Sequence, residues 1–256
     1  MLPPSHGSPE LPADGPPLVT VVIPTYNERD NLAPLVRRVL EAGPDFSILV
    51  VDDNSPDGTG ELADELSSKH PGRVRVLHRD KKSGIGPAYR AGFREALALG
   101  SPIIAQMDAD GSHDPAALPR LVAVLQQADV VLGSRYVAGG STRGWPLHRR
   151  LISRLGGLYA RIVLGVPIAD LTGGFKAYRR EALIAINPDQ IRSDGYCFQI
   201  ETTYRALQCG CRVVEVPIVF VDRVAGKSKL SRRIVLEAMI MVWRLRFSRR
   251  RIICGS

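Results

Sequence analysis

Short runs of apolar, largely β-branched residues recur along the first half of the chain, and a polar turn and a helical pattern separate each run from the next. This alternation is the feature that most constrains the fold. Strands separated by helices pair in parallel, and the helices cover both faces of the sheet. We therefore predict an α/β fold, Rossmann-like, with a mostly parallel sheet. Its strands are expected at residues 18–23, 46–51, 73–78, 102–107 and 129–133.

The second half of the chain is less regular. Helical periodicity predicts a helix over residues 147–164 and a last helix over about 231–247, each with an apolar face and several arginines. Residues 170–176 form a compact polar turn before a short strand. Residues 212–221 are typical of a strand, but Pro217 interrupts it, which favours a position at the sheet edge.

Length and composition suggest one large domain. The chain has 256 residues, of which 45% are hydrophobic, enough for a full core. Residues 1–17 are rich in Pro, Gly and Ser and lack the pattern of a signal peptide, so we expect a disordered tail. We expect the main domain at 18–230 and an amphipathic basic helix and tail at 231–256. No segment has the roughly 18 uninterrupted apolar residues that a membrane span needs.

The formal net charge of +8 favours anionic partners such as nucleotides, lipid phosphates or nucleic acid. Nucleic acid is not expected, because no aromatic-rich stacking platform accompanies the basic run at 249–251.

The chain has four cysteines, and their spacing matches no zinc-binding pair of Cys-x-x-Cys motifs. We expect idle or buried thiols in a reducing compartment. The residues are Cys197, Cys209, Cys211 and Cys254.

Two carboxylates, Asp108 and Asp110, directly follow the apolar run at 102–107. They are hard oxygen ligands that suit Mg²⁺ or Mn²⁺. The alternative is an ordinary polar turn. Glu28 and Asp52 end two other expected strands, and such clusters at strand ends are typical of a nucleotide site on an open sheet. No Gly-x-Gly-x-x-Gly or P-loop motif is present.

Six motifs in order resemble the family-2 glycosyltransferases with a GT-A fold, and the last two narrow the resemblance to the polyprenol-phosphate (dolichol-phosphate) mannose synthases. The similarity covers about residues 18–230. The motifs lie at residues 24–28, 52–59, 108–115, 133–136, 170–175 and 222–229.

The resemblance implies transfer of mannose from GDP-mannose to a polyprenyl monophosphate, with Mg²⁺ or Mn²⁺ as cofactor. It implies metal ligands at Asp108, Asp110 and Ser112, and catalytic roles for Asp110, Arg135 and Arg223. Arg135, Arg223 and Lys229 would contact phosphates. Gly111 departs from the family, which usually has a bulkier apolar residue there. The implied nucleotide-binding residues are Pro24, Tyr26, Glu28, Val50, Asp52, Asp108, Ala109 and Asp110.

A lipid monophosphate is already anionic at neutral pH, so we expect no general base. A single displacement would invert the anomeric centre and give a β-linked product. Two alternatives remain open: a related transferase that uses UDP-glucose or another sugar nucleotide, and a non-catalytic protein that binds nucleotide sugars or lipids.

The implied lipid substrate favours a peripheral protein on the cytoplasmic face of a membrane. The helices at 147–164 and 231–247 are the expected contacts, with apolar faces in the lipid and arginines at head groups. The alternative is that the apolar face of 231–247 packs on the core. An integral-membrane partner protein is also compatible with the sequence.

Overall fold

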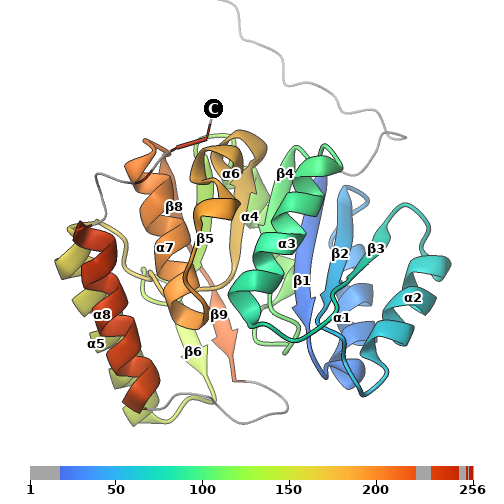
Figure 1. Cartoon of the computed structure of the whole chain (residues 1–256), viewed down its shortest axis with the longest axis horizontal. Helices are drawn as coiled ribbons and strands as arrows, with labels where there is room; N and C mark the ends of the chain where they lie inside the picture. Colours follow the sequence, from blue (N-terminus) through green and yellow to red (C-terminus); the bar gives the residue numbers. More distant parts are fainter. Residues whose placement is uncertain (1–17, 223–231, 248–251, 253, 256) are drawn as a thin grey trace, which may run out of the picture.

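The computed structural model describes residues 18–222, 232–247, 252, 254 and 255. A seven-stranded sheet has the order β3-β2-β1-β4-β7-β5-β8, and helices cover both of its faces (Figure 1). The strands are β1 (Val19–Thr25), β2 (Phe46–Asp52), β3 (Val74–His78), β4 (Ile103–Gln106), β5 (Val130–Ser134), β6 (Ser141–Arg143), β7 (Lys176–Arg179), β8 (Val213–Pro217) and β9 (Val219–Val221). The α-helices are α1 (Arg29–Glu41), α2 (Thr59–Lys69), α3 (Ile85–Ala98), α4 (Leu118–Val124), α5 (Leu147–Leu164), α6 (Arg180–Ile186), α7 (Gly195–Gln208) and α8 (Arg232–Phe247).

The predicted mostly parallel α/β fold is confirmed. All five strands expected in the first half are present, and β1 pairs in parallel with β2 and β4. The exception is β7, which lies antiparallel between β4 and β5. Pro217 ends β8, which is an edge strand as expected, and the chain then continues into β9, which pairs with β6 in a separate two-stranded sheet.

The core consists of two layers, one on each face of the sheet. Side chains alternate between faces along a strand, so Val21 and Ile23 of β1 pack with α1 while Val22 packs with α3. These residues are fully buried on both faces. This explains why the first strands have continuous apolar sequences rather than alternating ones.

A buried ion pair joins the end of β5 to the loop before β7. The guanidinium of Arg135 donates to both carboxylate oxygens of Asp170, at 2.7 Å from Nε and 2.6 Å from Nη2. The side chains are only 5% and 0% exposed. The backbone N–H groups of Ala169 and Asp170 donate in turn to Glu215 on β8. The loop before β7 is therefore bound by the guanidinium of Arg135 and by the carboxylate of Glu215.

Helix α8 packs against α5 and α7 (Figure 1). Its Val242 and Leu245 are buried in the core, which confirms the alternative that this helix packs by an apolar face. Its Trp243 and Phe247 are 47% and 77% exposed, so α8 also presents apolar surface to solvent. The domain boundary at residue 230 remains a prediction.

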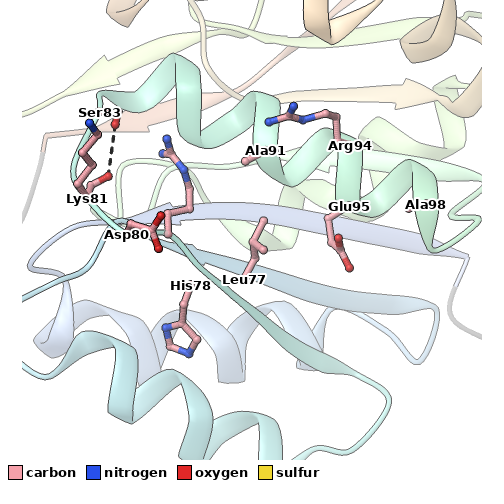
Figure 2. Close-up of a pocket in the computed structure, with 10 residues that line it drawn as sticks. Leu77, His78, Asp80, Lys81, Ser83, Ala91, Arg94, Glu95 and Ala98 are labelled. Atoms are coloured by element: carbon pink, nitrogen blue, oxygen red, sulfur yellow. Dashed lines mark hydrogen bonds between the residues drawn. The ribbon is translucent and has the colours of Figure 1, made fainter.

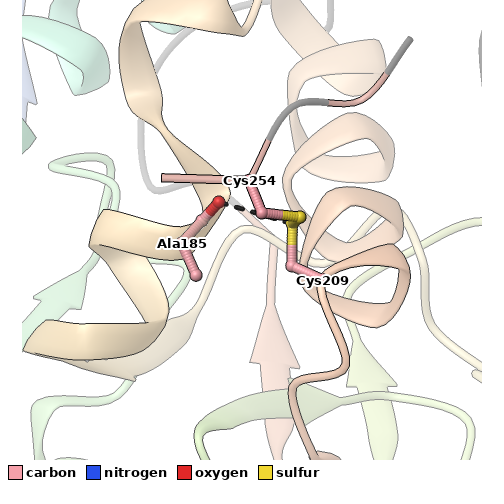
Figure 3. Close-up of a disulfide and its surroundings, with 3 residues drawn as sticks. All are labelled: Ala185, Cys209 and Cys254. Atoms are coloured by element: carbon pink, nitrogen blue, oxygen red, sulfur yellow. Dashed lines mark hydrogen bonds between the residues drawn. A yellow bond between two sulfur atoms is a disulfide. The ribbon is translucent and has the colours of Figure 1, made fainter. Parts of the chain in front are cut away.

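The expectation of four thiols is wrong for two of the cysteines. Cys209, at the end of α7, forms a disulfide with Cys254, whose sequence separation is 45 residues (Figure 3). Gly255 N–H donates to the carbonyl of Ala185, so the C-terminal residues lie against the end of α6. Sequence spacing could not reveal this pair because only the packing of α8 brings the tail back over α7. Cys197 and Cys211 are free thiols.

We expect the disulfide to stabilise the fold by roughly 2–4 kcal/mol, because it closes a long loop in the unfolded chain. Reductant should lower the thermal midpoint of the wild type, and Cys254→Ser should match the reduced protein and show no further response to reductant. Thiol titration in denaturant should find two free thiols. Four free thiols in protein purified without reductant, or equal midpoints with and without reductant, would contradict the assignment.

We expect Asp170→Ala to destabilise the protein by about 3–5 kcal/mol in urea unfolding, because it leaves the buried Arg135 charge without a counter-charge. The matched control is Asp189→Ala. It removes an ion pair with Arg94 whose side chains are 64% and 60% exposed, so its cost should stay below about 1 kcal/mol. Equal effects of the two substitutions would show that burial of the pair has no energetic consequence.

Candidate active site

The turns that follow β1, β2, β3 and β4 lie along one edge of the sheet, because these four strands are parallel and adjacent. This is the lower edge in Figure 1. The strand order reverses at β1, which has β2 on one side and β4 on the other. Ligands of open α/β sheets bind at such a reversal. The predicted residues of the β1, β2 and β4 turns surround this point.

Hydrogen bonds join the first two turns. The backbone N–H of Glu28 donates to the hydroxyl of Thr59 at 3.0 Å. The Asp52 carboxylate accepts from the hydroxyls of Thr25 at 2.9 Å and Ser55 at 2.6 Å, and it is only 2% exposed. Asp52 therefore shapes the turn through its hydrogen bonds, and the structure brings it together with the β1 turn as predicted.

The other implied nucleotide contacts differ in accessibility. Tyr26 is partly exposed, and the ammonium of Lys82 lies 3.7 Å from the centre of its ring. Val50 and Ala109 are buried, at 0% and 3% exposure. Lys82 was not among the predicted residues, because only the folded chain brings the β3 turn over Tyr26.

The β3 turn is tied to the β2 turn through Asp53. Its carboxylate pairs with Arg79 and accepts a hydrogen bond from the backbone N–H of Ser83 at 3.1 Å. The two turns therefore form one unit that carries Lys82.

The acidic motif lies at the end of β4. The phenol of Tyr89 donates to Asp108 Oδ1 at 2.7 Å. Asp110 is 8% exposed, and its Oδ1 accepts from the backbone N–H of Ser112 at 3.1 Å. The Ser112 hydroxyl is fully buried and has no hydrogen-bond partner within the described residues.

The motif fits a hard divalent cation. Unpartnered buried hydroxyls are rare, and the one in Ser112 belongs to the same loop as the carboxylates of Asp108 and Asp110. Hydroxyl and carboxylate oxygens are the kind of ligand that Mg²⁺ or Mn²⁺ prefers. The described residues contain no group of three or more His, Cys, Asp or Glu that could hold a metal ion. In many Mg²⁺ sites, one or two carboxylates and the substrate phosphates supply the ligands.

His113, which the sequence analysis did not assign, supports the same loop. Its Nδ1 accepts the backbone N–H of Asp108 at 3.1 Å, and its ring stacks on Phe175 with centroids 5.0 Å apart. The edge of Phe220 packs at 5.4 Å. Burial lowers the pKa of His113, so the ring is neutral and can accept this hydrogen bond. His113 lies in the motif at 108–115, but its role depends on contacts with separate segments that the sequence alone does not reveal.

The three implied phosphate-binding cations are not all described. Arg223 and Lys229 lie outside the described residues, so their roles remain predictions. Arg135 is 6% exposed and also donates to the Thr172 hydroxyl at 2.7 Å. Asp170 could not be identified from the sequence as the partner of Arg135, because the two residues are 35 positions apart.

A second buried cation, Lys176, lies at the start of β7. Its amine donates to the carbonyl of Gln199 at 2.7 Å and the hydroxyl of Thr202 at 2.9 Å. Burial lowers the pKa of Lys176 to about 7. The amine is therefore partly neutral at physiological pH, unlike the permanently charged Arg135.

An open hollow of about 550 Å³ lies between β3 and α3, apart from the acidic motif (Figure 2). Its lining includes Arg79, Lys81 and Arg94, but none of the residues predicted to bind metal or nucleotide is among the described residues that line it. We place the site at the β1–β4 turns on its chemistry, not on the size of a hollow. Among the described helices, none is long and apolar enough to cross a membrane.

The chain matches the family model "Glycosyl transferase family 2" over residues 20–186. It is 52% identical to the polyprenol monophosphomannose synthase of Mycolicibacterium smegmatis, over 88% of this chain and 86% of that protein. It is 50% identical to the undecaprenyl-phosphate mannosyltransferase of Micrococcus luteus, over 88% of this chain and 93% of that protein.

Solved structures share the fold at lower identity. A mannosyltransferase from Pyrobaculum calidifontis, in complex with GDP-Man and Mn²⁺, is 22% identical with a TM-score of 0.59, over 84% of this chain and 59% of that chain. Glucosyl-3-phosphoglycerate synthase from Mycobacterium tuberculosis, with Mn²⁺ and UDP, is 20% identical with a TM-score of 0.59, over 90% of this chain and 77% of that chain. The family model covers residues 20–186, and the two relatives are 50–52% identical over 88% of this chain. This protein is therefore a glycosyltransferase of family 2.

Proposed function

We propose that the protein transfers mannose from GDP-mannose to a polyprenyl monophosphate and forms a β-linked product by inverting displacement. The observation that carries the proposal is the acidic motif at the end of β4 in a chain that is 50–52% identical, over 88% of its length, to enzymes named for mannosyl transfer to polyprenyl phosphates. GDP-mannose as the donor rests on the family resemblance. UDP-glucose is the competing donor.

Asp108, Asp110 and the Ser112 hydroxyl would hold Mg²⁺ or Mn²⁺. The bound ion would neutralise the charge that develops on the departing diphosphate. The motif residues are fixed before substrate binds, because Asp110 accepts from the backbone of Ser112 and Asp108 accepts from Tyr89. Such preorganisation reduces the reorganisation needed in the reaction.

Arg135 would add a fixed positive charge. Its Nε and Nη2 groups donate to Asp170 and Thr172, and within the described residues no acceptor pairs with Nη1. A phosphate oxygen could accept from Nη1. The nearby carboxylate raises the pKa of Arg135 despite its burial, so the guanidinium stays charged. In this proposal Arg223 and Lys229 supply the remaining phosphate contacts.

The ends of β1 and β2 and the turn after β1 would hold the guanosine through Pro24, Tyr26, Glu28, Val50 and Asp52. Ala109, after β4, would also contact the nucleotide. The carboxylate of Glu28 accepts from the side-chain amide of Asn31 at 2.7 Å, which fixes its orientation. No side chain is assigned as a general base, because the acceptor phosphate is already anionic. The protein's contribution is to orient two anions that repel each other.

A lipid acceptor is consistent with an exposed apolar surface on α5. Five of its residues recur every three or four positions, as one helical stripe requires, and each is at least 49% exposed. This surface lies on a helix that contacts α8, whose Trp243 and Phe247 are also exposed. We propose that it lies on the cytoplasmic face of a membrane, with an integral-membrane partner as the alternative occupant. The stripe residues are Leu147, Leu151, Leu155, Leu158 and Ile162.

Transfer of radiolabelled mannose from GDP-mannose into a polyprenyl phosphate should yield organic-soluble label that EDTA abolishes and Mn²⁺ or Mg²⁺ restores. We expect Asp110→Ala to reduce the rate by about 100-fold or more, because it removes a charge at the developing diphosphate. The control is Asp114→Asn, an acidic residue of the same loop that pairs with Arg38 on the surface.

Transfer from UDP-glucose but not from GDP-mannose would show that UDP-glucose is the donor. An α-linked product would contradict the displacement mechanism. Binding of nucleotide sugar without transfer from either donor would favour the non-catalytic alternative.

The double substitution Leu151→Gln and Leu155→Gln should reduce binding to anionic vesicles by roughly tenfold, because two apolar side chains lose their lipid contacts. Vesicle sedimentation measures this effect. The control is Leu99→Gln, an exposed leucine that follows α3 and is 40% exposed. Unchanged vesicle binding by the double variant would leave the surface to a protein partner.

A further inference from the structure

Tyr89 on α3 is a fully buried tyrosine whose hydroxyl reaches the acidic motif. The ring has 0% exposure and stacks on Phe93 and Phe198, with centroids 5.8 Å and 5.6 Å apart. The hydroxyl lies 2.7 Å from Asp108 Oδ1. Two aromatic contacts thus fix the ring, and the only polar atom of the side chain is directed at a candidate metal ligand.

The hydrogen bond is of the strong, charge-assisted kind. The neutral phenol donates to a carboxylate oxygen at 2.7 Å. Hydrogen bonds from neutral donors to charged acceptors are shorter and stronger than those between neutral groups. The terminal torsion of an aspartate is broad when nothing restrains it. The Tyr89 hydroxyl therefore restricts rotation of the Asp108 carboxylate.

Gly174 and His113 also lie close to Asp108. A Cβ at Gly174 would lie 3.4 Å from Asp108 Oδ2 and 3.5 Å from His113 Cε1. The backbone N–H of Asp108 is bound by His113. The carboxylate thus lies between the α3 hydroxyl and the loop before β7.

Helix α3 is itself anchored at its first turn. The Asp194 carboxylate accepts the backbone N–H of Gly86 at 2.6 Å. A Cβ at Gly84, where φ is +103°, would lie 2.0 Å from Asp194 Oδ2, so only glycine allows this approach. The Asp194 contact fixes the start of α3 one turn before Tyr89.

We propose that Tyr89 is a positioning residue for metal and donor binding. Its hydroxyl fixes the rotation of the Asp108 carboxylate, and so sets the orientation in which Asp108 would bind the divalent metal ion that accompanies the sugar nucleotide. This inference rests on the proposed metal site. Partners that hydrogen-bond to ligating carboxylates typically change metal affinity by about 10–100-fold when they are removed.

Tyr89→Phe removes the hydroxyl and keeps the ring. We expect the dissociation constant for Mn²⁺, measured by electron paramagnetic resonance with GDP present, to rise at least about tenfold. Transfer activity should fall at low Mn²⁺ and recover towards the wild-type rate at high Mn²⁺, so that the apparent affinity for metal changes more than kcat.

The matched control is Tyr204→Phe. Tyr204 on α7 is also 0% exposed, but its hydroxyl has no hydrogen-bond partner within the described residues. This control should bind Mn²⁺ as the wild type does. Thermal midpoints of both variants are measured on the same samples to separate ligand positioning from general loosening of the core.

Wild-type Mn²⁺ affinity in Tyr89→Phe would overturn the positioning role and leave the proposed function intact. A loss of affinity accompanied by a large fall in thermal midpoint, absent from Tyr204→Phe, would also overturn it, because general loosening of the fold, rather than rotation of the Asp108 carboxylate, would then be responsible. A wild-type protein that binds no Mn²⁺, with or without GDP, would overturn the proposed metal site and the positioning role together.

Discussion

The backbone ladder of β7 is the interaction on which the site depends. This strand pairs antiparallel with both β4 and β5, and Lys176 is opposite Gln106 on one side and Leu132 on the other. Because β7 runs against its neighbours, the loop before it lies at the same edge as the carboxyl ends of β4 and β5. That loop places Asp170 against Arg135 and Gly174 beside Asp108. A parallel strand in this position would have put the loop at the opposite edge, away from the acidic motif.

Charge in this region is divided between structural and functional groups. Asp53 and Asp170 each accept more than one hydrogen bond from the chain and stabilise turns. Asp108 and Asp110 belong to a loop that also contains a buried hydroxyl without a partner in the described residues, at Ser112. Burying a polar group without a partner costs free energy. The proposed cation would supply the partner that the Ser112 hydroxyl lacks among the described residues.

Local patterns in the sequence predicted the five strands of the first half, the helix at 147–164 with the same bounds as α5, and the positions of the acidic turns. They did not predict β6, or the division of residues 212–221 into β8 and β9. The features that these patterns did not predict depend on contacts between distant segments. The direction of β7, the Arg135–Asp170 pair and the Cys209–Cys254 disulfide each depend on how elements pack after they form. Tyr89 was not among the predicted site residues, because its contact with Asp108 requires the register of α3 against β4. Periodicity defines elements, but it does not specify which side chains meet across them.

A continuous set of ring contacts links the acidic motif to the exposed stripe on α5. His113 packs against Phe220 at 5.4 Å, Phe220 against Trp145 at 5.3 Å, and the guanidinium of Arg149 lies 4.2 Å from the Trp145 ring. Arg149 also pairs with Asp222 at 2.7 Å, which ties the first turn of α5 to the end of β9. The first stripe residue, Leu147, is 80% exposed. The helix proposed to lie on the membrane therefore begins a few side chains from the loop proposed to bind the donor. A lipid phosphate that arrives along this surface would reach the transferred sugar while its hydrocarbon chain remained in the bilayer.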